Sequence, residues 1–350
     1  MKRKSTVKVM VGLLVGLVFT LGVNSAFAKT YQWKMHTFVP EPVILYKGYM
    51  IPFIKTIEKR SKGQIQITPY ALGGIVGPRD LLMSTAENVI QLALSSPSFD
   101  IGAVPEANAL SNLPFGFETA YQAHEFWTTN KVAGDIIDKA YSAKGIKFAA
   151  ALQSADPQTF LTMFPVKEMS EFKGHLICGA GYWSILIKNV GASAVVLKNL
   201  GEVYQSLEKG VFDGIFMAHT ALSDFKWNEV VKDVMTPALT FGGSLEVIVN
   251  KKAFDSLTPE LQRILLETAR EMNATHMIPA TAMVADQAVE EAKVKGVQFN
   301  ELSDSELNKF RVASTNVWEY IENVNQNTKT IIDQIKMTLD AKGIKYPGEK

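Results

Sequence analysis

Residues 31–38 read YQWKMHTF, and residues 64–68 read QIQIT. Apolar and polar side chains alternate in both stretches, which predicts two β-strands. Between them, apolar residues recur at helical spacing from Ile44 to Arg60, and Gly63 marks the end of this predicted helix. A strand, a helix and a second strand in this order are typical of an α/β protein with a largely parallel sheet.

The same alternation continues along the chain. Apolar runs predict further strands at residues 90–95, 146–152, 174–178, 194–197 and 212–217. Helical spacing predicts helices at residues 79–87, 120–127, 132–143, 182–190 and 202–209. The last third of the chain is predicted to be helical, over residues 259–295 and 303–339. Thr258 and Pro259 have the residue types preferred at a helix N-terminus, so they mark its start.

A change of lobe is expected near Gln153. We assign two segments to each lobe: residues 29–152 and 237–280 to lobe 1, and residues 153–236 and 281–350 to lobe 2. The helical region 259–295 is expected to span both. Each lobe is long enough to bury a core of its own, so the sequence predicts a two-lobed α/β protein.

The N-terminus has the pattern of a signal peptide. Lys2, Arg3, Lys4 and Lys8 precede an uncharged apolar stretch at residues 9–23, and an A-x-A pattern follows at residues 26–28. We expect cleavage after Ala28 and export to the periplasm. An uncleaved signal anchor is the alternative, and the shortness of the apolar stretch disfavours it.

Composition and charge exclude some classes of protein. Loss of the four basic residues in the first 28 changes the formal net charge from +1 to −3. A mildly acidic protein lacks the clustered positive charge of a nucleic-acid-binding surface. Cys178 is the only cysteine, so the chain cannot form an internal disulfide.

The sequence contains no recognisable catalytic or metal-binding pattern. The five histidines, at positions 36, 124, 175, 219 and 276, do not have the spacing of zinc ligands, and there is no nucleophile elbow or P-loop. The glycines at 73, 74 and 77 indicate a turn. His175 and Cys178 are three residues apart on a predicted strand, which places their side chains on opposite faces. We therefore expect a protein that is not an enzyme and has no cofactor or metal.

Four motifs occur in a fixed order along the chain. Residues 113–117 read LPFGF, residues 171–178 read EFKGHLIC, residues 201–214 read GEVYQSLEKGVFDG, and residues 257–262 read LTPELQ. With these motifs the chain resembles the solute-binding proteins of tripartite ATP-independent periplasmic (TRAP) transporters, of the dicarboxylate-binding type. The resemblance extends over nearly the whole chain that follows the predicted signal peptide.

This resemblance implies a two-lobed periplasmic binding protein fold (type II-like) with an inter-lobe ligand cleft and long C-terminal helices. It implies a receptor that binds a small organic solute, an organic acid by family, and delivers it to the TRAP membrane permease subunits. The alternative is a periplasmic sensor that presents its closed form to a membrane receptor kinase. Either a monomer or a dimer is compatible with the sequence.

The chain departs from the family at the residues that bind the ligand's carboxylate. Family members commonly place an arginine at the end of the strand that here ends in Cys178, because a guanidinium matches a carboxylate bidentately. They also have an asparagine where this chain has Met217, and a second arginine that is absent from residues 152–164. A thiol and a thioether make the pocket softer and more apolar. Aromatic or amine-bearing solutes are therefore an alternative to an organic acid.

Candidate ligand-binding side chains lie at the ends of predicted strands or in the loops that follow them. Aromatic candidates suit an apolar solute body, polar candidates suit its hydrogen-bonding groups, and Arg79 is the one arginine near a predicted cleft. The twelve predicted site residues are Trp183, Cys178, Met217, Phe38, His36, Phe99, Ser98, Gln153, Asp156, Phe241, Glu246 and Arg79. Glu41, Ser95, Phe160, Tyr182, Phe216 and His219 are further candidates. An ordinary core role for the aromatic residues and a solvated role for the acids are the alternatives.

Overall fold

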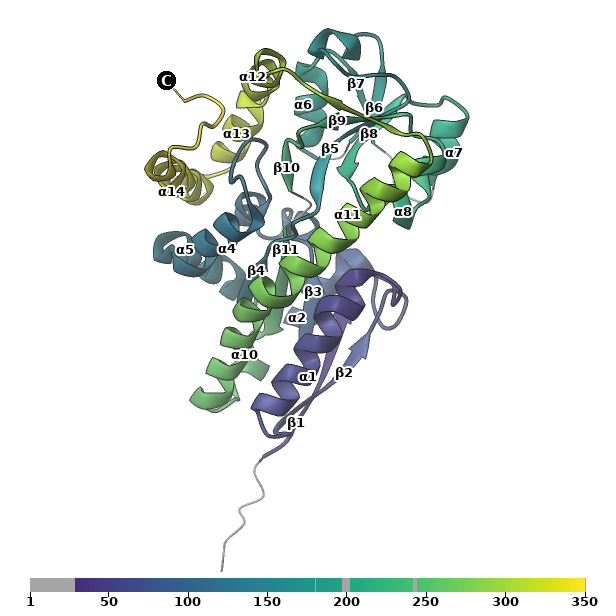
Figure 1. The fold of residues 1–350 in the computed structure, drawn as a ribbon. Helices are drawn as coiled ribbons and strands as arrows, with labels where there is room; N and C mark the ends of the chain where they lie inside the picture. Colours follow the sequence, from purple (N-terminus) through teal and green to yellow (C-terminus); the bar gives the residue numbers. More distant parts are fainter. Residues whose placement is uncertain (1–28, 180, 197–201, 242–243, 350) are drawn as a thin grey trace, which may run out of the picture.

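The computed structural model describes residues 29–179, 181–196, 202–241 and 244–349. These residues form a mixed α/β fold with two β-sheets, which lie in the lower and upper halves of Figure 1. The predicted α/β class and the long C-terminal helices are confirmed. The predicted signal peptide at residues 1–28 lies outside the described residues, as does residue 197 of one predicted strand.

The first sheet has five strands in the order β2-β1-β3-β11-β4. Their bounds are Tyr31–Thr37 for β1, Ile65–Tyr70 for β2, Leu92–Ser95 for β3, Ile146–Leu152 for β4 and Leu245–Asn250 for β11. Strands β2, β1 and β3 are parallel, as predicted. Strand β11 runs antiparallel to both of its neighbours. It enters from the second sheet at the end where β4 leaves, so it must run in the opposite direction.

The second sheet has seven strands, in the order β12-β9-β5-β8-β6-β7, with β10 paired to β5. Their bounds are Pro157–Thr162 for β5, Leu176–Cys178 for β6, Ser193–Val195 for β7, Gly214–Ala218 for β8, Asp233–Thr236 for β9, Thr240–Phe241 for β10 and Gln298–Glu301 for β12. Strands β6, β7 and β8 are parallel, whereas β5 is antiparallel to β8, β9 and β10. The prediction of a largely parallel sheet is therefore wrong for β5 and β11, the strands that enter from the other sheet.

Helices cover both faces of each sheet. Beside the first sheet lie η1 (Leu45–Met50), α1 (Ile51–Arg60), η2 (Pro78–Asp80), α2 (Leu81–Ala86), α3 (Pro97–Asp100), η3 (Pro105–Leu110), α4 (Ala120–Thr129), α5 (Lys131–Ser142), α9 (Lys251–Asp255) and α10 (Pro259–Met272). Helices α1 and α10 pack on one face, and α2 and α5 pack on the other.

The second sheet has its own two helical layers. They comprise η4 (Met169–Phe172), α6 (Trp183–Asn189), α7 (Val203–Glu208), α8 (Ala221–Asp224), η6 (Trp227–Glu229), α11 (Ile278–Val294), α12 (Asp304–Ala313) and α13 (Thr315–Glu322). Helices α6, α12 and α13 pack on one face, and α7, α8 and α11 pack on the other.

One long helical segment, formed by α10, η7 and α11, runs from the first sheet to the second (Figure 1). It begins at Pro259, and the side chain of Thr258 caps it by accepting the backbone N–H of Leu261. Between α10 and α11, the turn η7 (Asn273–Met277) is a π-helix. A π-turn widens the backbone locally and is frequent at functional positions in helices.

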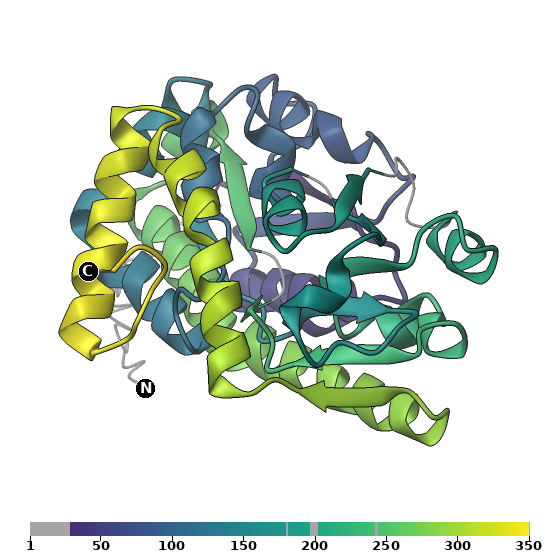
Figure 2. The ribbon, with the colours of Figure 1, turned by 90° about the horizontal axis from the view of Figure 1, so that it is seen from above.

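The last helix returns to the first sheet. Helix α14 (Gln326–Lys342) packs against α5 and η3, and its buried isoleucines join the same core as Ile137 and Tyr141. Figure 2 shows these yellow C-terminal helices along one side of the molecule. Part of the range 281–350, which the sequence assigned to lobe 2, therefore packs beside the first sheet. The lobe boundaries themselves stay a prediction.

Candidate functional site

The strand ends of the two sheets meet at the first crossover, the four residues 153–156 that join β4 to β5. Because β5 runs antiparallel to β8, its first residue lies beside the end of β8, and the N–H of His219 donates to Pro157 O at 2.9 Å. The four residues of this crossover therefore lead from the end of β4 to the start of β5, which lies beside the end of β8. Ligands of open α/β sheets bind outside the carboxyl ends of the strands. We call the residues here the inter-lobe site: 36–38, 95–100, 153–156, 178–179, 181–183, 217–220 and 244–246.

The lobe 1 side of the inter-lobe site contains buried polar atoms without partners. Ser95 and Glu246 are paired directly between β3 and β11, so their side chains project from the same face of the sheet. The Ser95 hydroxyl and both amide atoms of Gln153 are buried and have no hydrogen-bond partner among the described residues. Buried polar atoms in folded proteins nearly always have a partner, which can be solvent or a ligand.

Glu246 belongs to a buried acidic cluster. It is fully buried, and the Tyr141 hydroxyl donates to its Oε2 at 2.5 Å. The carboxyl group of Asp100 lies within hydrogen-bonding reach of Glu246. Burial raises the pKa of both carboxyls, and the charge of Asp100 raises the pKa of Glu246 further. Two carboxylates this close cannot both ionise, so the pair keeps a proton.

His36 holds a neighbouring turn. It is buried, and its Nε2 accepts the backbone N–H of Ile75 at 3.0 Å. Burial lowers the pKa of His36, in keeping with a neutral ring whose Nε2 is an acceptor. His36 thus positions the glycine turn at residues 73–77, and Arg79, which follows this turn, is exposed.

On the lobe 2 side, Asp156 ties the first crossover to the end of β8. Its Oδ2 accepts the hydroxyl of Thr220 at 2.6 Å and its Oδ1 accepts the Thr220 N–H at 3.3 Å. Burial raises the pKa of Asp156 to about 7. The adjacent His219 is also buried, and neither ring nitrogen has a partner among the described residues. Burial lowers the pKa of His219 to about 4, so the ring is neutral at pH 7.

Cys178 and Met217 lie on one face of the second sheet. Cys178 pairs with Ile215 between β6 and β8, and Met217 is two residues further along β8. Both side chains pack on the core that α7, α8 and α11 cover. The two positions at which the chain departs from the family motif therefore lie close together, as the motif implied.

Three predicted aromatic side chains form a continuous group at the start of α6. The ring of Trp183 stacks on Phe216 at 4.2 Å between centroids, and Tyr182 contacts Trp183 at 4.8 Å. Burial raises the pKa of Tyr182 to about 12, and a hydrogen bond with Ser111 of lobe 1 opposes this shift. The group therefore reaches from lobe 2 to lobe 1. Phe160, in contrast, is fully buried in the lobe 2 core.

A second aromatic pair lies on lobe 1. Phe38 follows β1, and its ring meets that of Phe99 edge-on at 5.2 Å between centroids. Both rings are half-buried. Ser98 is exposed, and its hydroxyl lies 2.8 Å from that of Ser96.

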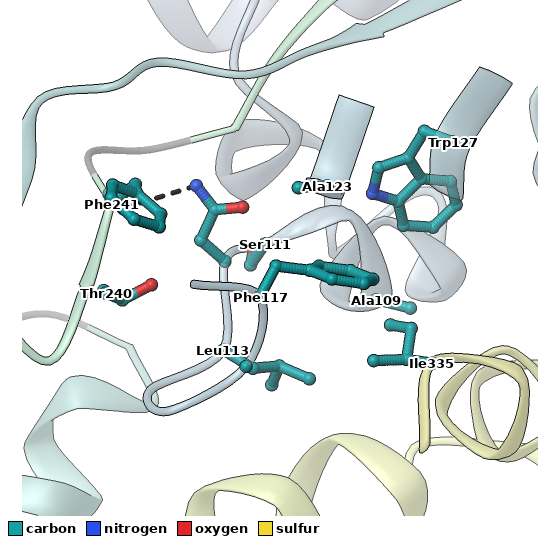
Figure 3. Close-up of a pocket in the computed structure, with 11 residues that line it drawn as sticks. Ala109, Ser111, Leu113, Phe117, Ala123, Trp127, Thr240, Phe241 and Ile335 are labelled. Carbon is teal, nitrogen blue, oxygen red and sulfur yellow. Dashed lines mark hydrogen bonds between the residues drawn. The ribbon is translucent and has the colours of Figure 1, made fainter. Parts of the chain in front are cut away.

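Phe241 lines a pocket outside the segments of the inter-lobe site. This pocket lies between the end of η3, α4, β10 and α14 (Figure 3). Figure 3 shows Phe117 and Trp127 on one side of it and Phe241 on the other. The backbone O of Phe241 accepts the side-chain amide of Asn112 at 3.3 Å. Of the twelve predicted site residues, Phe241 is the one that lines this pocket.

Several residues that belong to the inter-lobe site or contact it were not predicted. Asp100 and Tyr141 contact Glu246, Thr220 binds Asp156, and Asn273 binds the backbone of Gln153. Thr220 follows the predicted strand at residues 212–217, so its place at a strand end was a usable signal. Tyr141 lies near the end of α5 and Asn273 lies within the helical segment 259–294, and the sequence gives no signal for either contact.

Some functional features are missing from the part of the chain that the structure describes. No group of three or more His, Cys, Asp and Glu side chains there could hold a metal ion. No helix in the described ranges is long and apolar enough to cross a membrane.

Comparison with known families gives one match over most of the chain. The model of the family described as bacterial extracellular solute-binding protein, family 7, matches residues 36–324.

Individual relatives agree with this match. A solute-binding protein of Albidiferax ferrireducens is 25% identical over 349 residues, covering 97% of this chain and all of that protein. The 2,3-diketo-L-gulonate-binding periplasmic protein of Escherichia coli is 24% identical over 220 residues, 63% of this chain and 66% of that protein. A crystal structure of a TRAP periplasmic solute-binding protein from Rhodoferax ferrireducens with bound malonate has a TM-score of 0.75 and 21% identity, covering 88% of this chain and 98% of that one. This structural likeness shows the shared fold.

Proposed function

Because the chain belongs to family 7 of the bacterial extracellular solute-binding proteins, which are not enzymes, we propose that it captures a small organic solute between its two lobes in the periplasm. We propose further that it delivers this solute to a TRAP-type membrane permease. The lobes close over the solute because the closed state binds it more tightly than the open state does.

We infer the location of the site from one observation. Several buried side-chain atoms at the strand ends have no partner among the described residues, and they include Ser95 Oγ, both amide atoms of Gln153 and both ring nitrogens of His219. Ser95 and Gln153 belong to the lobe 1 side and His219 to the lobe 2 side. A solute between the lobes would give these hydroxyl, amide and imidazole groups the partners that buried polar atoms normally have.

The chemistry of the same residues narrows the solute class. Cys178 and Met217 stand where family members commonly have an arginine and an asparagine, so a guanidinium clamp for a carboxylate is absent from these positions. The Trp183 group offers a flat apolar surface instead, which suits a ring or an apolar chain. We therefore propose a solute with an apolar or aromatic body, bound by uncharged hydrogen-bonding groups on both lobes.

The charged residues near the site bear on the charge of the solute. Arg79 is the one arginine that the sequence placed near the cleft, and it is exposed. Glu246 and Asp100 are protonated as a pair, and an amine on the solute could take the place of their shared proton. Relatives include proteins whose names or titles give carboxylates, namely 2,3-diketo-L-gulonate and malonate. An experiment therefore has to compare organic acids with aromatic and amine-bearing solutes.

A thermal-shift screen of residues 29–350 tests this proposal, because a ligand that binds the native state raises Tm. The panel pairs each aliphatic acid, such as malonate, with an aromatic acid, an aromatic amine and an uncharged aromatic analogue. Stabilisation by an aromatic or amine compound, lost in Trp183→Ala, supports the proposed pocket. Stabilisation by small aliphatic carboxylates alone contradicts the ligand class, and no response to any solute contradicts the function.

The role in transport needs a separate test. Uptake of the identified solute by cells should fall when this protein is removed and return when it is supplied again. If removal leaves uptake unchanged but abolishes a transcriptional response to the solute, the sensor alternative holds instead.

A further inference from the structure

Three buried acceptor atoms lie together on one face of the first sheet. Ser95 and Glu246 are paired directly between β3 and β11, so their Cβ atoms are about 5 Å apart. The carboxyl group of Asp100, at the end of α3, lies within hydrogen-bonding reach of Glu246. Ser95 Oγ, Asp100 Oδ2 and Glu246 Oε1 are buried, and none of them has a hydrogen-bond partner among the described residues. We call these three residues the acceptor cluster.

The Ser95 hydroxyl points to a ligand independently of the two acids. A proton shared by the carboxyls supplies a partner for Asp100 Oδ2 and Glu246 Oε1, but it leaves Ser95 Oγ without one. Ser95 is fully buried and projects from the same face of the sheet as Glu246. Because a buried hydroxyl nearly always has a partner, a ligand group that reaches the acceptor cluster would supply it.

The charge of the acceptor cluster is also uncompensated. With one shared proton, the two carboxyls keep one negative charge, and burial makes an isolated charge costly. In the described part of the chain, no lysine, arginine or histidine side chain forms an ion pair with Asp100 or Glu246. A group with a positive charge and several N–H donors therefore fits these acceptors. An ammonium has three N–H donors, one for each of the three oxygens.

Two aromatic rings stand at the edge of the acceptor cluster. Phe38 follows β1 and lies beside Ser95, which ends the neighbouring strand β3. Phe99 directly precedes Asp100, and its ring meets that of Phe38 edge-on at 5.2 Å between centroids. Both rings are half-buried. The negative potential of an aromatic face stabilises a nearby cation, and the same rings suit the apolar body of a solute.

We propose that Ser95, Asp100 and Glu246 form a subsite for the ammonium group of the solute. The proposal rests on the proposed solute-binding function and names the solute class as a primary amine with an apolar or aromatic body. The ammonium enters beside the two phenylalanine rings and donates one N–H to each of the three oxygens. The proton shared by the carboxyls passes to solvent, so one H⁺ is released for each amine bound, and the amine keeps its own three N–H hydrogens.

Other titratable groups lie around the acceptor cluster and keep their own partners. Tyr141 of α5 donates to Glu246 Oε2, and burial raises the pKa of Tyr141 well above its ordinary value, so it stays protonated. His36 of β1 projects from the same face of the sheet, and burial lowers its pKa while its Nε2 accepts the N–H of Ile75. The charged side chains of the turns that contact α3 are Arg79 and Asp80, which are exposed, and Glu106, which accepts the amides of Asn325 and Asn327.

Titration calorimetry with residues 29–350 tests the proposal. The probes are benzylamine, phenethylamine and tryptamine, each compared with the alcohol and the carboxylic acid of the same ring system. Titrations in phosphate and in Tris buffer give the number of protons released. An amine of this set should bind with release of about one proton, and its affinity should rise about tenfold for each pH unit between pH 5 and pH 7. The alcohols should show neither effect.

The double variant Asp100→Asn/Glu246→Gln identifies the source of the proton, because Asp156 of the inter-lobe site also has a pKa of about 7. The variant keeps the shape of both side chains, and its amides can bond to each other and to Tyr141, but it has no proton to release and no charge. Its affinity for the amine should be about tenfold lower or more at pH 7 and should no longer follow pH. Ser95→Ala removes the neutral acceptor and should weaken amine binding about fivefold.

Asp233→Asn is the matched control. Asp233 is a buried carboxyl of β9 whose pKa burial raises to about 6, but its Oδ1 already accepts the N–H of Val166 at 3.2 Å. This variant should bind the amine and release the proton as the wild type does.

Several results would overturn the proposal. Amine binding without proton release does so, as does equal affinity of the double variant and the wild type. The same proton release with potassium chloride alone would assign the acceptor cluster to an inorganic cation instead. If alcohols or acids bind and no amine does, the ammonium subsite is wrong while the solute-binding function stands, and if no compound binds, the function itself fails. Should the double variant not fold, the proton count of the wild type and the affinity of Ser95→Ala decide.

Discussion

The indole ring of Trp183 stacks on Phe216 with 4.2 Å between ring centroids and 27° between their planes. Trp183 begins α6, directly after the strand that ends in Cys178, whereas Phe216 lies in the middle of β8. One face of the half-buried indole is thus used by the core of lobe 2. The remaining exposed part lies at the strand ends, where the proposed solute binds.

Replacement of Trp183 should separate its role in the fold from its role in binding. Trp183→Ala removes the stack and the apolar surface, so we expect solute affinity to fall about tenfold and stability to fall by about 1 kcal/mol. Trp183→Phe keeps an aromatic ring and should retain most of both. Isothermal titration with the solute from the screen and thermal unfolding measure the two effects. Equal affinity of the alanine variant and the wild type would contradict the proposed contact.

Local patterning was enough to predict the strand–helix units. The alternation at residues 31–38 and 64–68 corresponds to β1 and β2, because each of these strands has one buried and one more exposed face along much of its length. Strand β11 is buried on both faces at every residue, so it has no alternation to detect. Strand β5 begins at a proline and likewise has no regular alternation. The sequence analysis missed both strands, together with the short strands β9, β10 and β12, and β5 and β11 are the ones that make the sheets mixed.

The site could be predicted as far as it depends on strand ends. Ser95 and Gln153 lie at or directly after the end of a predicted strand, which is why a pattern-based analysis selected them, whereas Glu246 lies near the start of β11, a strand that was not predicted. The contact of Tyr141 with Glu246 joins residues 105 positions apart and depends on how α5 packs against the first sheet. No local pattern contains that information. Identification of Cys178 and Met217 came from the family motif, since a buried thiol and thioether alone would indicate ordinary core.

Replacement of Glu246 by glutamine tests the shared proton of the acidic pair. Because burial and Asp100 raise the pKa of Glu246 well above its ordinary value, the folded protein keeps a proton that the unfolded chain loses near pH 4. Stability therefore falls as pH rises above that value. Glu246→Gln removes this ionisation and can still accept from Tyr141, so it should be more stable than the wild type at pH 8, by about 1 kcal/mol or more.

Urea unfolding of Glu246→Gln and the wild type at pH 5 and pH 8 measures this difference. Tyr141→Phe is the companion variant, and loss of its bond to Glu246 should cost about 1–2 kcal/mol at either pH. A glutamine variant that is less stable than the wild type at pH 8 would mean that Glu246 is ionised and satisfied in the folded protein.

Asp156 should make the stability of the protein decrease with pH. Its pKa is about 7 in the folded protein, where burial is the main cause, and about 4 in the unfolded chain. Between these values the folded protein holds the proton and the unfolded chain does not, so stability falls as pH rises from about 4 to about 7. Asp156→Asn removes this fall, because an asparagine side chain does not ionise. Its amide oxygen can still accept the Thr220 N–H, and its amide nitrogen can donate to the Thr220 hydroxyl. The unfolding free energy of the variant minus that of the wild type should therefore increase across this window, and a flat difference would contradict the raised pKa.

His219 should act in the opposite direction over nearly the same range. Its pKa is about 4 in the folded protein and about 6.5 in the unfolded chain, because burial without a partner disfavours the charged ring. Between these values the unfolded chain binds a proton that the folded protein does not, so stability rises with pH, by about 2–3 kcal/mol in total. His219→Gln removes this rise, and the unfolding free energy of the variant minus that of the wild type should decrease from pH 4 to pH 6.5.

The opposite slopes of Asp156→Asn and His219→Gln, measured in the same buffers, distinguish these two neighbours from any general effect of pH on the fold. If saturating solute binds the neutral ring it lowers the pKa of His219 further, so the rise in stability should then extend below pH 4; a rise that still levels off near pH 4 would contradict a contact between the solute and the ring.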